Sequence, residues 1–432
     1  MSNPPSRGRL ALLVGGGPAP GINGVISSVT IEAINHGIEV LGFQDGFKWL
    51  VQNNAEHNRP LTIDIVKNIH RRGGSILGTS RTNPTRSEAD MRNTLDVLRR
   101  LNVNHVVTIG GDDTAYSASR VCAEAGGAIR VAHVPKTIDN DLPLPGSTPT
   151  FGFETARHLG VGIVNNLAED ARTTSRWYLI VSMGRAAGHL ALGIGKAAAA
   201  TLTIIPEEFR NRPMTLDELC DILLGAIIKR RSQGSHYGVA VLAEGLLESI
   251  GEAGLLAVMD AAQLGRYGKV RRDPHGHLRL GEIEFGRMVR DRLTAKLEEL
   301  DLSVHLIDKD LGYELRCADP IPFDAEYTRD LGYGAVKFLR SETAGQFGAI
   351  ISFVGGHMEP LPFDTMLNPV TKRMQTRKVN VDGEAYECAR RYMIRLERRD
   401  LEEPERLARL AAAAGMAPER FRERFAYLVG LQ

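Results

Sequence analysis

The stretch His105–Asp141, HVVTIGGDDTAYSASRVCAEAGGAIRVAHVPKTIDND, contains two short apolar runs that each end in an acidic turn. The first run, His105–Ile109, has no helix breaker, which is typical of a buried parallel strand. A helix is expected over about 114–125, where paired glycines end it, and the second apolar run covers 128–134. This order of strand, helix and strand predicts a βαβ unit in a parallel sheet.

The two turns place ionisable side chains at the carboxyl edge of that sheet. Gly110–Thr114 follows the first strand, and Pro135–Asp141 follows the second. Carboxyl ends of parallel strands meet at one edge, and ligands of open α/β sheets bind there. Glycines in the first turn let the backbone come close to a ligand. We therefore expect the following side chains to lie near one another: Asp112, Asp113, Asp139, Asp141 and Lys136.

Composition and charge exclude several classes of function. The 432 residues suffice for two lobes, and a net charge of +1 gives no field for nucleic acid or membrane. The basic loop with Arg266, Lys269, Arg271 and Arg272 is therefore interpreted as a solvated excursion. The four cysteines form no CxxC pair, so we expect no disulfide, no zinc site and a cytoplasmic location. No segment resembles a membrane span or a secretory signal.

Alternating strands and helices continue on both sides of the opening stretch. Strands are expected over 10–14, 38–43, 177–181, 202–205, 238–242, 304–307 and 348–353. Helices are expected between them, among them 63–70, 186–200 and 333–341, and a charged helical tail follows residue 384. We therefore predict an α/β fold with two similar three-layer α/β/α lobes and mostly parallel sheets.

Two further glycine-rich turns are candidate phosphate sites. The turn Gly15–Gly21 leads from a strand into a helix N-terminus, which is a ready anion site. It is not GxGxxG and no Walker lysine follows, so a dinucleotide or P-loop site is not supported. Taken alone, this turn is equally well a tight structural turn. Arg81, after a second glycine-rich loop, could bind a phosphate bidentately or could be a solvated surface arginine.

Together these motifs resemble the phosphofructokinase family, and most closely its pyrophosphate-dependent branch. The turn Gly16–Asn23 resembles the family's GG-x-APG-x-N, and Gly73–Arg81 resembles its GG-x-x-LG-x-x-R. Other matching segments follow in family order: Met183–Arg185, Glu244 and Leu311–Arg316. The resemblance spans about residues 10–364. It implies a phosphofructokinase-like fold and reversible transfer of a phosphoryl group from pyrophosphate to fructose 6-phosphate, giving fructose 1,6-bisphosphate.

The resemblance also implies a role for each matching residue. Asp139 is similar to the family's catalytic base, and Thr137, Asp141 and Arg185 resemble the residues that assist it. Asp112 resembles the family's metal ligand, and its hard oxygens suit Mg²⁺. The donor-binding set is Gly16, Arg81, Gly111, Asp112, Asp113 and Lys136. The sugar-binding set is Thr137, Asp139, Arg176, Met183, Gly184, Arg185, Glu244, Tyr313 and Arg316. Helix N-capping could explain Asp112 or Asp113, but not both loops together.

Two positions bear on the choice of phosphoryl donor. ATP-using members of the family carry glycine where this chain has Asp113 and Lys136. A carboxylate at position 113 would occupy the space of a nucleotide's α-phosphate and repel its charge. The Lys136 ammonium suits a small, highly charged anion instead. A misplaced like charge costs several kcal/mol in a site of low dielectric, so we expect pyrophosphate to be the donor.

The resemblance further implies a division of the chain and an assembly. Residues 1–150 with about 315–364 are expected to form the phosphate-donor lobe. Residues 151–314 with about 365–432 are expected to form the sugar-phosphate lobe and the C-terminal helices. In the family, the equivalent of Arg176 reaches the neighbouring subunit's site. This implies a homodimer or homotetramer with shared active sites.

Some features depart from the family pattern and leave alternatives open. Ile307 stands where some relatives have a phosphate-binding arginine, whose task could pass to Lys309, Arg377 or Lys378. The rival functions are an ATP-dependent 6-phosphofructokinase and a regulatory paralogue without catalysis. A dinucleotide-binding oxidoreductase is a third possible function, but this chain lacks the GxGxxG fingerprint of that class.

Overall fold

A computed structural model describes residues 8–185, 187–268, 283–368 and 374–431. The chain forms two compact units, each built from two segments. Unit 1 comprises Met1–Ala156 and Tyr313–Arg377, and unit 2 comprises Arg157–Gly312 and Lys378–Gln432. Most of the basic loop that the sequence analysis interpreted as solvated, Lys269–Arg272, lies outside the described residues.

Unit 1 contains a mostly parallel sheet in the order β11-β10-β5-β4-β1-β2-β3. Its strands are β1 (Arg9–Val14), β2 (Glu39–Phe43), β3 (Asn58–Leu61), β4 (His105–Gly110), β5 (Arg130–Pro135), β10 (Ala349–Val354) and β11 (His357–Pro362). The five central strands are parallel, and the two edge strands, β3 and β11, are antiparallel. Pro60 and Pro360 lie in the edge strands, where a missing backbone donor is tolerated.

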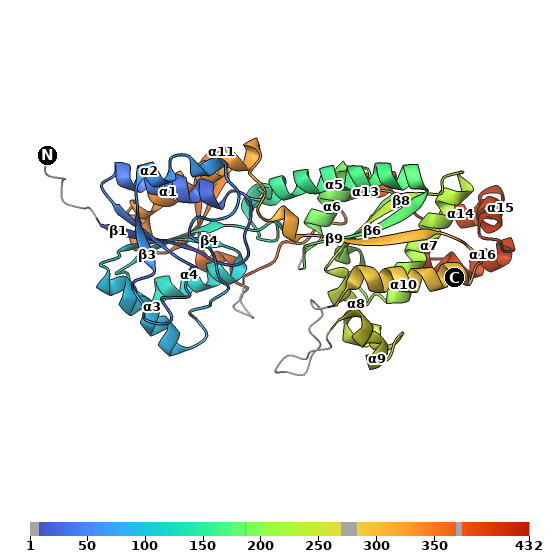
Figure 1. The fold of residues 1–432 in the computed structure, drawn as a ribbon, viewed down its shortest axis with the longest axis horizontal. Helices are drawn as coiled ribbons and strands as arrows, with labels where there is room; N and C mark the ends of the chain where they lie inside the picture. Colours follow the sequence, from blue (N-terminus) through green and yellow to red (C-terminus); the bar gives the residue numbers. More distant parts are fainter. Residues whose placement is uncertain (1–7, 186, 269–282, 369–373, 432) are drawn as a thin grey trace. The chain divides into compact units, whose positions relative to one another are not determined.

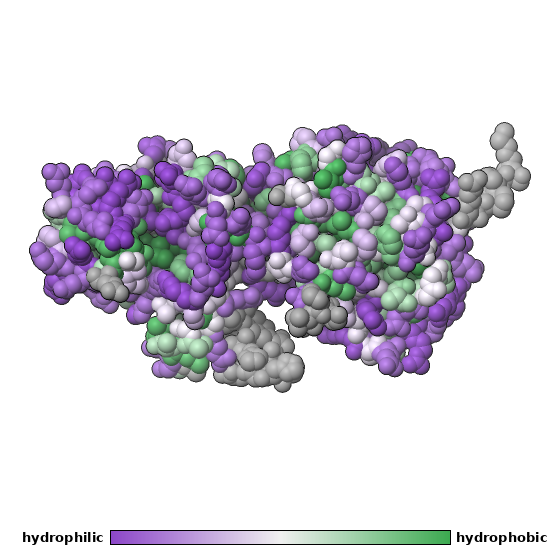
Figure 2. Space-filling model, turned by 180° about the vertical axis from the view of Figure 1, so that it is seen from behind, coloured by the Kyte–Doolittle hydropathy of each residue, from purple (hydrophilic) through white to green (hydrophobic). Residues whose placement is uncertain are grey.

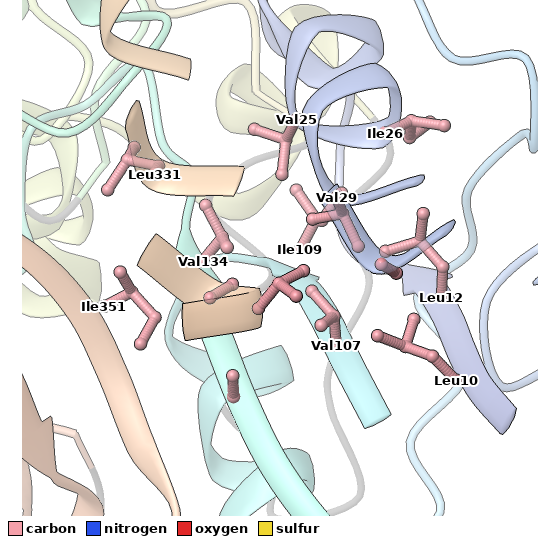
Figure 3. Close-up of a cluster of buried hydrophobic side chains, with 14 of the residues drawn as sticks. Leu10, Leu12, Val25, Ile26, Val29, Val107, Ile109, Val134, Leu331 and Ile351 are labelled. Carbon is pink, nitrogen blue, oxygen red and sulfur yellow. The ribbon is translucent and has the colours of Figure 1, made fainter. Parts of the chain in front are cut away.

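Helices cover both faces of this sheet (Figure 1). They are α1 (Ile22–Asn35), α2 (Ile63–Val66), the 3-10 turn η1 (Ile69–Arg71), α3 (Glu88–Arg100), α4 (Asp112–Glu124), α11 (Pro322–Leu339) and α12 (Phe363–Met366). Leu10, Leu12, Val107, Ile109 and Val134 pack against Val25 and Val29 of α1 and Leu331 of α11 (Figure 3). The alternate strand residues Ala11, Leu13, Val106 and Val131 belong to a second core with α3 and α4. Because the central strands are buried on both faces, unit 1 is a three-layer α/β/α structure.

Unit 2 contains a parallel sheet in the order β7-β8-β6-β9. Its strands are β6 (Arg176–Ser182), β7 (Leu202–Ile204), β8 (Gly238–Ala243) and β9 (His305–Leu311). Its helices are most of α5 (Phe153–Thr174), α6 (His189–Ala197), α7 (Leu216–Ser232), α8 (Leu246–Leu256), α9 (Ala261–Leu264) and α10 (Phe285–Glu298), followed by α13 (Glu384–Tyr392), α14 (Arg398–Glu402), α15 (Pro404–Ala413) and α16 (Pro418–Phe425). The predicted α/β class with mostly parallel sheets is confirmed.

Several elements differ from those expected. Helix α11 begins at Pro322 rather than near residue 333, because proline suits the first turn of a helix. The helix expected over 63–70 is two short pieces, α2 and η1, and the helix expected over 186–200 runs only over 189–197. The edge strands β3 and β11 were not predicted.

A buried carboxylate fixes the start of helix α5. Asp324, on α11, is fully buried and accepts hydrogen bonds from Gly152 N (2.8 Å), Thr155 N (2.8 Å) and Thr155 Oγ1 (2.6 Å). Burial raises the pKa of Asp324, whereas these three donors lower it. Because the donors lie at the first turn of α5, this carboxylate joins two helices that are distant in sequence.

The surface of the molecule is mostly polar on the face that Figure 2 shows. Apolar side chains gather there over the segment of α8 and α9, where Leu256 is exposed. Among the described helices, none is long and apolar enough to cross a membrane.

Candidate active site

Three neighbouring strands of unit 1 bring their carboxyl ends to one edge. Strand β4 lies between β1 and β5, with Ile109 opposite Val14 and Gly110 opposite Pro135. Backbone hydrogen bonds continue past the strands, from Lys136 N to Gly110 O (2.8 Å) and from Gly15 N to Ile109 O (2.8 Å). The glycine turn after β1 and the acidic turns after β4 and β5 therefore begin side by side, as expected.

The Lys136 ammonium lies buried against the glycine turn. Lys136 is 4% exposed, and its Nζ donates a hydrogen bond to the Gly17 carbonyl. A Cβ atom at Gly16 would lie 3.5 Å from this Nζ, and a Cβ atom at Gly17 would lie 3.5 Å from the Arg316 guanidinium carbon. Gly16 also has φ +80, which glycine adopts without strain. Two cations thus pack directly on a two-glycine backbone.

The charges around Lys136 favour a bound anion. Burial, together with the positive charges of Arg316 and Arg81, lowers the pKa of Lys136 to about 8. Asp139 and Asp141 oppose this effect and raise the pKa. Three cations that disfavour one another in the free protein would all be stabilised by a multiply charged anion. The Arg316 guanidinium also lies over the Tyr313 ring, 4.8 Å from the ring centroid. Both residues belong to unit 1.

The turn around Gly16 is tied to the loop that carries Arg81. Gly16 N donates to Ser80 O (2.9 Å), and Thr79 Oγ1 donates to Gly16 O (2.7 Å). The amide of Gly16 is therefore engaged in this loop contact. The contribution of Gly16 to the site is the close approach that it allows to Lys136.

Asp112 and Asp113 occupy the first turn of α4, where the helix dipole stabilises negative charge. The N-cap of this helix is Gly111, and no side chain makes a capping hydrogen bond there. Helix capping therefore does not account for either aspartate. The carboxylates extend from the same edge as the Lys136 turn, since Gly111 follows β4 directly.

The turn after β5 orders the remaining acidic residues. Asp139 N donates to Thr137 Oγ1 (3.0 Å), and Thr150 Oγ1 donates to Thr137 O (2.7 Å). Burial and the negative charge of Asp112 raise the pKa of Asp141, whereas the Thr137 hydroxyl lowers it. The effect of Asp112 on this pKa shows that Asp112 and Asp141 are close enough to interact.

The acidic residues fit Mg²⁺ better than a metal held by protein alone. Among the described residues, no group of three or more His, Cys, Asp or Glu side chains is placed to hold a metal ion. Mg²⁺ commonly uses one or two carboxylates and completes its shell with water and substrate phosphates. Asp112, in the first turn of α4, could supply one such carboxylate.

A buried histidine supports these turns and was not anticipated from the sequence. His133, on β5, has hydrogen-bond contacts to Thr108 Oγ1 through Nδ1 (2.8 Å) and to Gly110 O through Nε2 (3.0 Å). Burial lowers the pKa of His133 to about 3, so the ring is neutral. Gly110 O also accepts from Lys136 N, so this one carbonyl connects the β4 and β5 turns.

Unit 2 brings together a second set of the predicted residues. Met183, Gly184 and Arg185 follow β6, and Glu244 follows the adjacent strand β8. Gly184 N donates to Glu244 Oε2 (3.4 Å), and Glu244 N donates to Ser182 O (2.9 Å). The Arg185 side chain is exposed, with its Nε 3.6 Å from Glu248 Oε1.

Arg176 lies at the other end of the same strand. It is the first residue of β6, whereas Met183 to Arg185 follow its last residue, Ser182. A strand rises 3.2–3.4 Å per residue, so this length of β6 separates the two ends by about 20 Å. The Arg176 guanidinium instead approaches Asp170, with 3.8 Å between Nη1 and Oδ2. Unit 2 therefore does not bring Arg176 to Arg185 and Glu244.

Comparisons with known proteins agree on one family. A profile of the phosphofructokinase family matches residues 9–339. The chain is 53% identical to pyrophosphate–fructose 6-phosphate 1-phosphotransferase of Thermotoga maritima, over 96% of this chain and 98% of that protein. It is 49% identical to the protein of the same name from Naegleria fowleri, over 97% and 95% of the two chains.

A solved structure supports the fold. Phosphofructokinase from Saccharomyces cerevisiae matches with a TM-score of 0.65 and 18% identity, over 97% of this chain. The chain spans half of that longer protein, 50% of its length. At this level of identity the match bears on the fold alone.

We predict that binding of pyrophosphate protonates Lys136. At pH 8 this side chain is about half deprotonated, and a bound anion raises its pKa, so wild type should take up about half a proton more per site than Lys136→Met. Calorimetric titration with pyrophosphate in two buffers of different ionisation enthalpy measures the difference. Lys48→Met, which removes an exposed lysine of the same unit, should behave like wild type. Equal proton uptake by wild type and Lys136→Met would contradict the prediction.

Proposed function

The chain belongs to the phosphofructokinase family, and we propose that it is an enzyme that transfers a phosphoryl group from pyrophosphate to fructose 6-phosphate. The bond between the bridging oxygen and one phosphorus of pyrophosphate breaks, and a bond from that phosphorus to the sugar 1-oxygen forms. The proton of the sugar 1-hydroxyl passes to a carboxylate. The products are fructose 1,6-bisphosphate and phosphate, and the reaction is reversible.

One observation carries the choice of donor: the buried Lys136 ammonium on the Gly16–Gly17 turn, with Arg316 and Arg81 adding positive charge. Pyrophosphate is small and highly charged, so it suits a compact cluster of cations. Asp113, in the next turn, is a negative charge that would repel the α-phosphate of a nucleotide. Both relatives described above carry names that specify pyrophosphate.

Each residue receives a chemical role in this proposal. Asp139 accepts the proton of the sugar hydroxyl, and Thr137 and Asp141 orient it, consistent with the hydrogen bond from Asp139 N to Thr137. Asp112 would hold Mg²⁺ together with the donor phosphates. Mg²⁺ when bound neutralises charge on the transferred phosphoryl group. Further donor contacts come from Arg81, Gly111, Asp113 and Lys136, and Gly16 leaves room for the Lys136 ammonium. Sugar phosphate is bound by Met183, Gly184, Arg185, Glu244, Tyr313 and Arg316.

The position of Arg176 supports a homo-oligomer with shared sites. Within one chain this arginine is about 20 Å along β6 from Arg185 and Glu244, so it cannot contact the same sugar phosphate. In a symmetric oligomer, the Arg176 of a second subunit could instead contact the sugar phosphate that is bound by Arg185 and Glu244 of the first subunit. We also propose a cytoplasmic location, in keeping with four cysteines that are all free.

We expect pyrophosphate, and not ATP, to support turnover of fructose 6-phosphate in the presence of Mg²⁺. Asp139→Asn should lower kcat by about 10²–10⁴-fold, because it removes the proton acceptor. Asp64→Asn, which alters an exposed carboxylate of unit 1, is the matched control and should leave kcat unchanged. Initial rates coupled to product detection measure these effects. Faster turnover with ATP would contradict the donor, and an unchanged rate in Asp139→Asn would contradict the mechanism.

The double variant Asp113→Gly with Lys136→Gly should shift donor preference toward ATP. It removes the repulsive carboxylate and the ammonium that fills the glycine turn, which together account for several kcal/mol of discrimination. The measurement is the ratio of kcat/KM for ATP to kcat/KM for pyrophosphate, which should rise by at least about 100-fold. A double variant that loses pyrophosphate activity and keeps the wild-type ratio would refute this account of specificity.

Subunit mixing should reveal shared active sites. Arg176→Ala and Asp139→Ala are each expected to be nearly inactive as homo-oligomers. A mixed dimer has both defects in one site and none in the other, so co-expression at equal levels should return about one quarter of the wild-type activity in the mixture and about one half in the purified mixed dimer. Separately tagged chains allow the mixed oligomer to be purified and assayed. Activity no greater than the sum of the parents would show that Arg176 does not act across subunits.

A further inference from the structure

The side chain and the backbone N–H of Arg377 donate hydrogen bonds to the loop that follows Asp139. Its Nε donates to Asn140 O (3.1 Å), its Nη1 donates to Thr148 O (2.9 Å), and its Nη2 donates to Asn140 Oδ1. Its backbone N–H donates to Asp141 O (2.6 Å). All three nitrogens of one guanidinium are therefore engaged by the loop, from residue 140 to residue 148.

The turn that Arg377 holds has an uncommon backbone conformation. Asn140 has φ +56, in the left-handed region, which asparagine adopts more readily than most residues because its side chain can hydrogen-bond locally. Its side-chain Oδ1 also accepts from Thr150 N (3.1 Å), so the amide is fixed from two sides. Because Asn140 directly follows Asp139, rotation of this residue would redirect the Asp139 carboxylate.

The guanidinium also adds a positive charge beside the acidic turn. Arg377 is partly buried, and burial lowers its pKa while Asp141 raises it. Arg377 in turn lowers the pKa of Asp141, against the effects of burial and of Asp112. Among the described residues, the hydrogen-bond acceptors of Arg377 are the carbonyls of Asn140, Asp141 and Thr148 and the side-chain amide of Asn140, so this arginine acts on the loop itself. These contacts weigh against Arg377 as the substitute for the phosphate-binding arginine near Ile307.

We propose that Arg377 is a positioning residue for the loop 137–141, which it holds in the left-handed turn that aims the Asp139 carboxylate at the sugar hydroxyl. The inference rests on the proposed function, since it assigns Asp139 as the base. It extends that function to a residue that lies 237 positions away from Asn140 in the sequence.

The test compares Arg377→Ala and Arg377→Lys with wild type and with Arg130→Ala. Arg130 is a matched control, because its Nη1 also donates to two backbone carbonyls, Leu339 O (2.9 Å) and Ser341 O (3.2 Å), at the opposite end of β5. Both Arg377 variants should lower kcat by about 100-fold, because a base displaced by about 1 Å loses that much rate. KM for pyrophosphate should change by less than about threefold, since Lys136 and its neighbours are untouched. Arg130→Ala should keep the wild-type kcat.

Chemical rescue separates positioning from general loss of structure. Millimolar guanidinium or methylguanidinium should restore kcat of Arg377→Ala in a saturable manner, and equal concentrations of sodium chloride should not. If Arg377→Ala does not fold, Arg377→Lys decides, because the single ammonium nitrogen of lysine cannot reproduce the planar fork in which three separate guanidinium nitrogens donate to these acceptors. Wild-type kcat in Arg377→Lys, or a folded Arg377→Ala that guanidinium does not rescue, would overturn the inference. Absence of pyrophosphate-dependent turnover in wild type would instead overturn the proposed function on which it rests.

Discussion

The site of unit 1 depends on a lysine ammonium that is buried among other positive charges. Lowering the pKa of Lys136 from 10.5 to about 8 corresponds to a cost of about 3 kcal/mol for keeping it protonated. The ammonium donates a hydrogen bond to Gly17 O, in the turn that follows β1 at the edge shared with β4 and β5. Repulsion between the Lys136 ammonium and the two arginines, Arg316 and Arg81, destabilises the free protein, and a bound anion of high charge would offset this repulsion. The same three strands end at this edge, so the pairing of the sheet positions both the cation and the carboxylates that we propose to select the donor.

Local sequence signals were sufficient for the centre of the fold and for the meeting of the two acidic turns. The apolar runs of β4 and β5 are short but uninterrupted, end in glycine or proline, and lie on either side of a helix that stops before Gly126, so each boundary has its own physical cause. The edge strands β3 and β11 carry prolines and polar residues, and their pairing comes from a neighbour rather than from their own pattern. Helix α11 was shortened in the prediction because Pro322 resembles a loop residue until its place at the helix start is known.

The supporting residues of the site could not be predicted in the same way. Nothing in the pattern around Arg377 distinguishes it from a solvated arginine, because its partners are backbone carbonyls of a distant loop. His133 follows the ordinary alternation of a buried strand, and only the three-dimensional structure reveals that it contacts Gly110 O. The roles of the residues at the strand ends remain predictions, whereas their placement on two separate units is an observation. Candidate site residues can thus be predicted from the sequence when they directly follow strands. The residues that hold those loops in place cannot be predicted in this way.

Unit 1 is assembled from two segments, and this has a consequence for biogenesis. The edge of β5 is paired by β10 through Ala132 with Ala349 and His133 with Ile350. During synthesis at about 5–20 residues per second, the ribosome needs roughly 10 to 40 seconds to proceed from β5 to β10. Throughout that interval the nascent chain exposes an unpaired, apolar strand edge, which is a template for association with other chains. Protection by a chaperone would matter most in that interval, before the second segment emerges and closes the sheet.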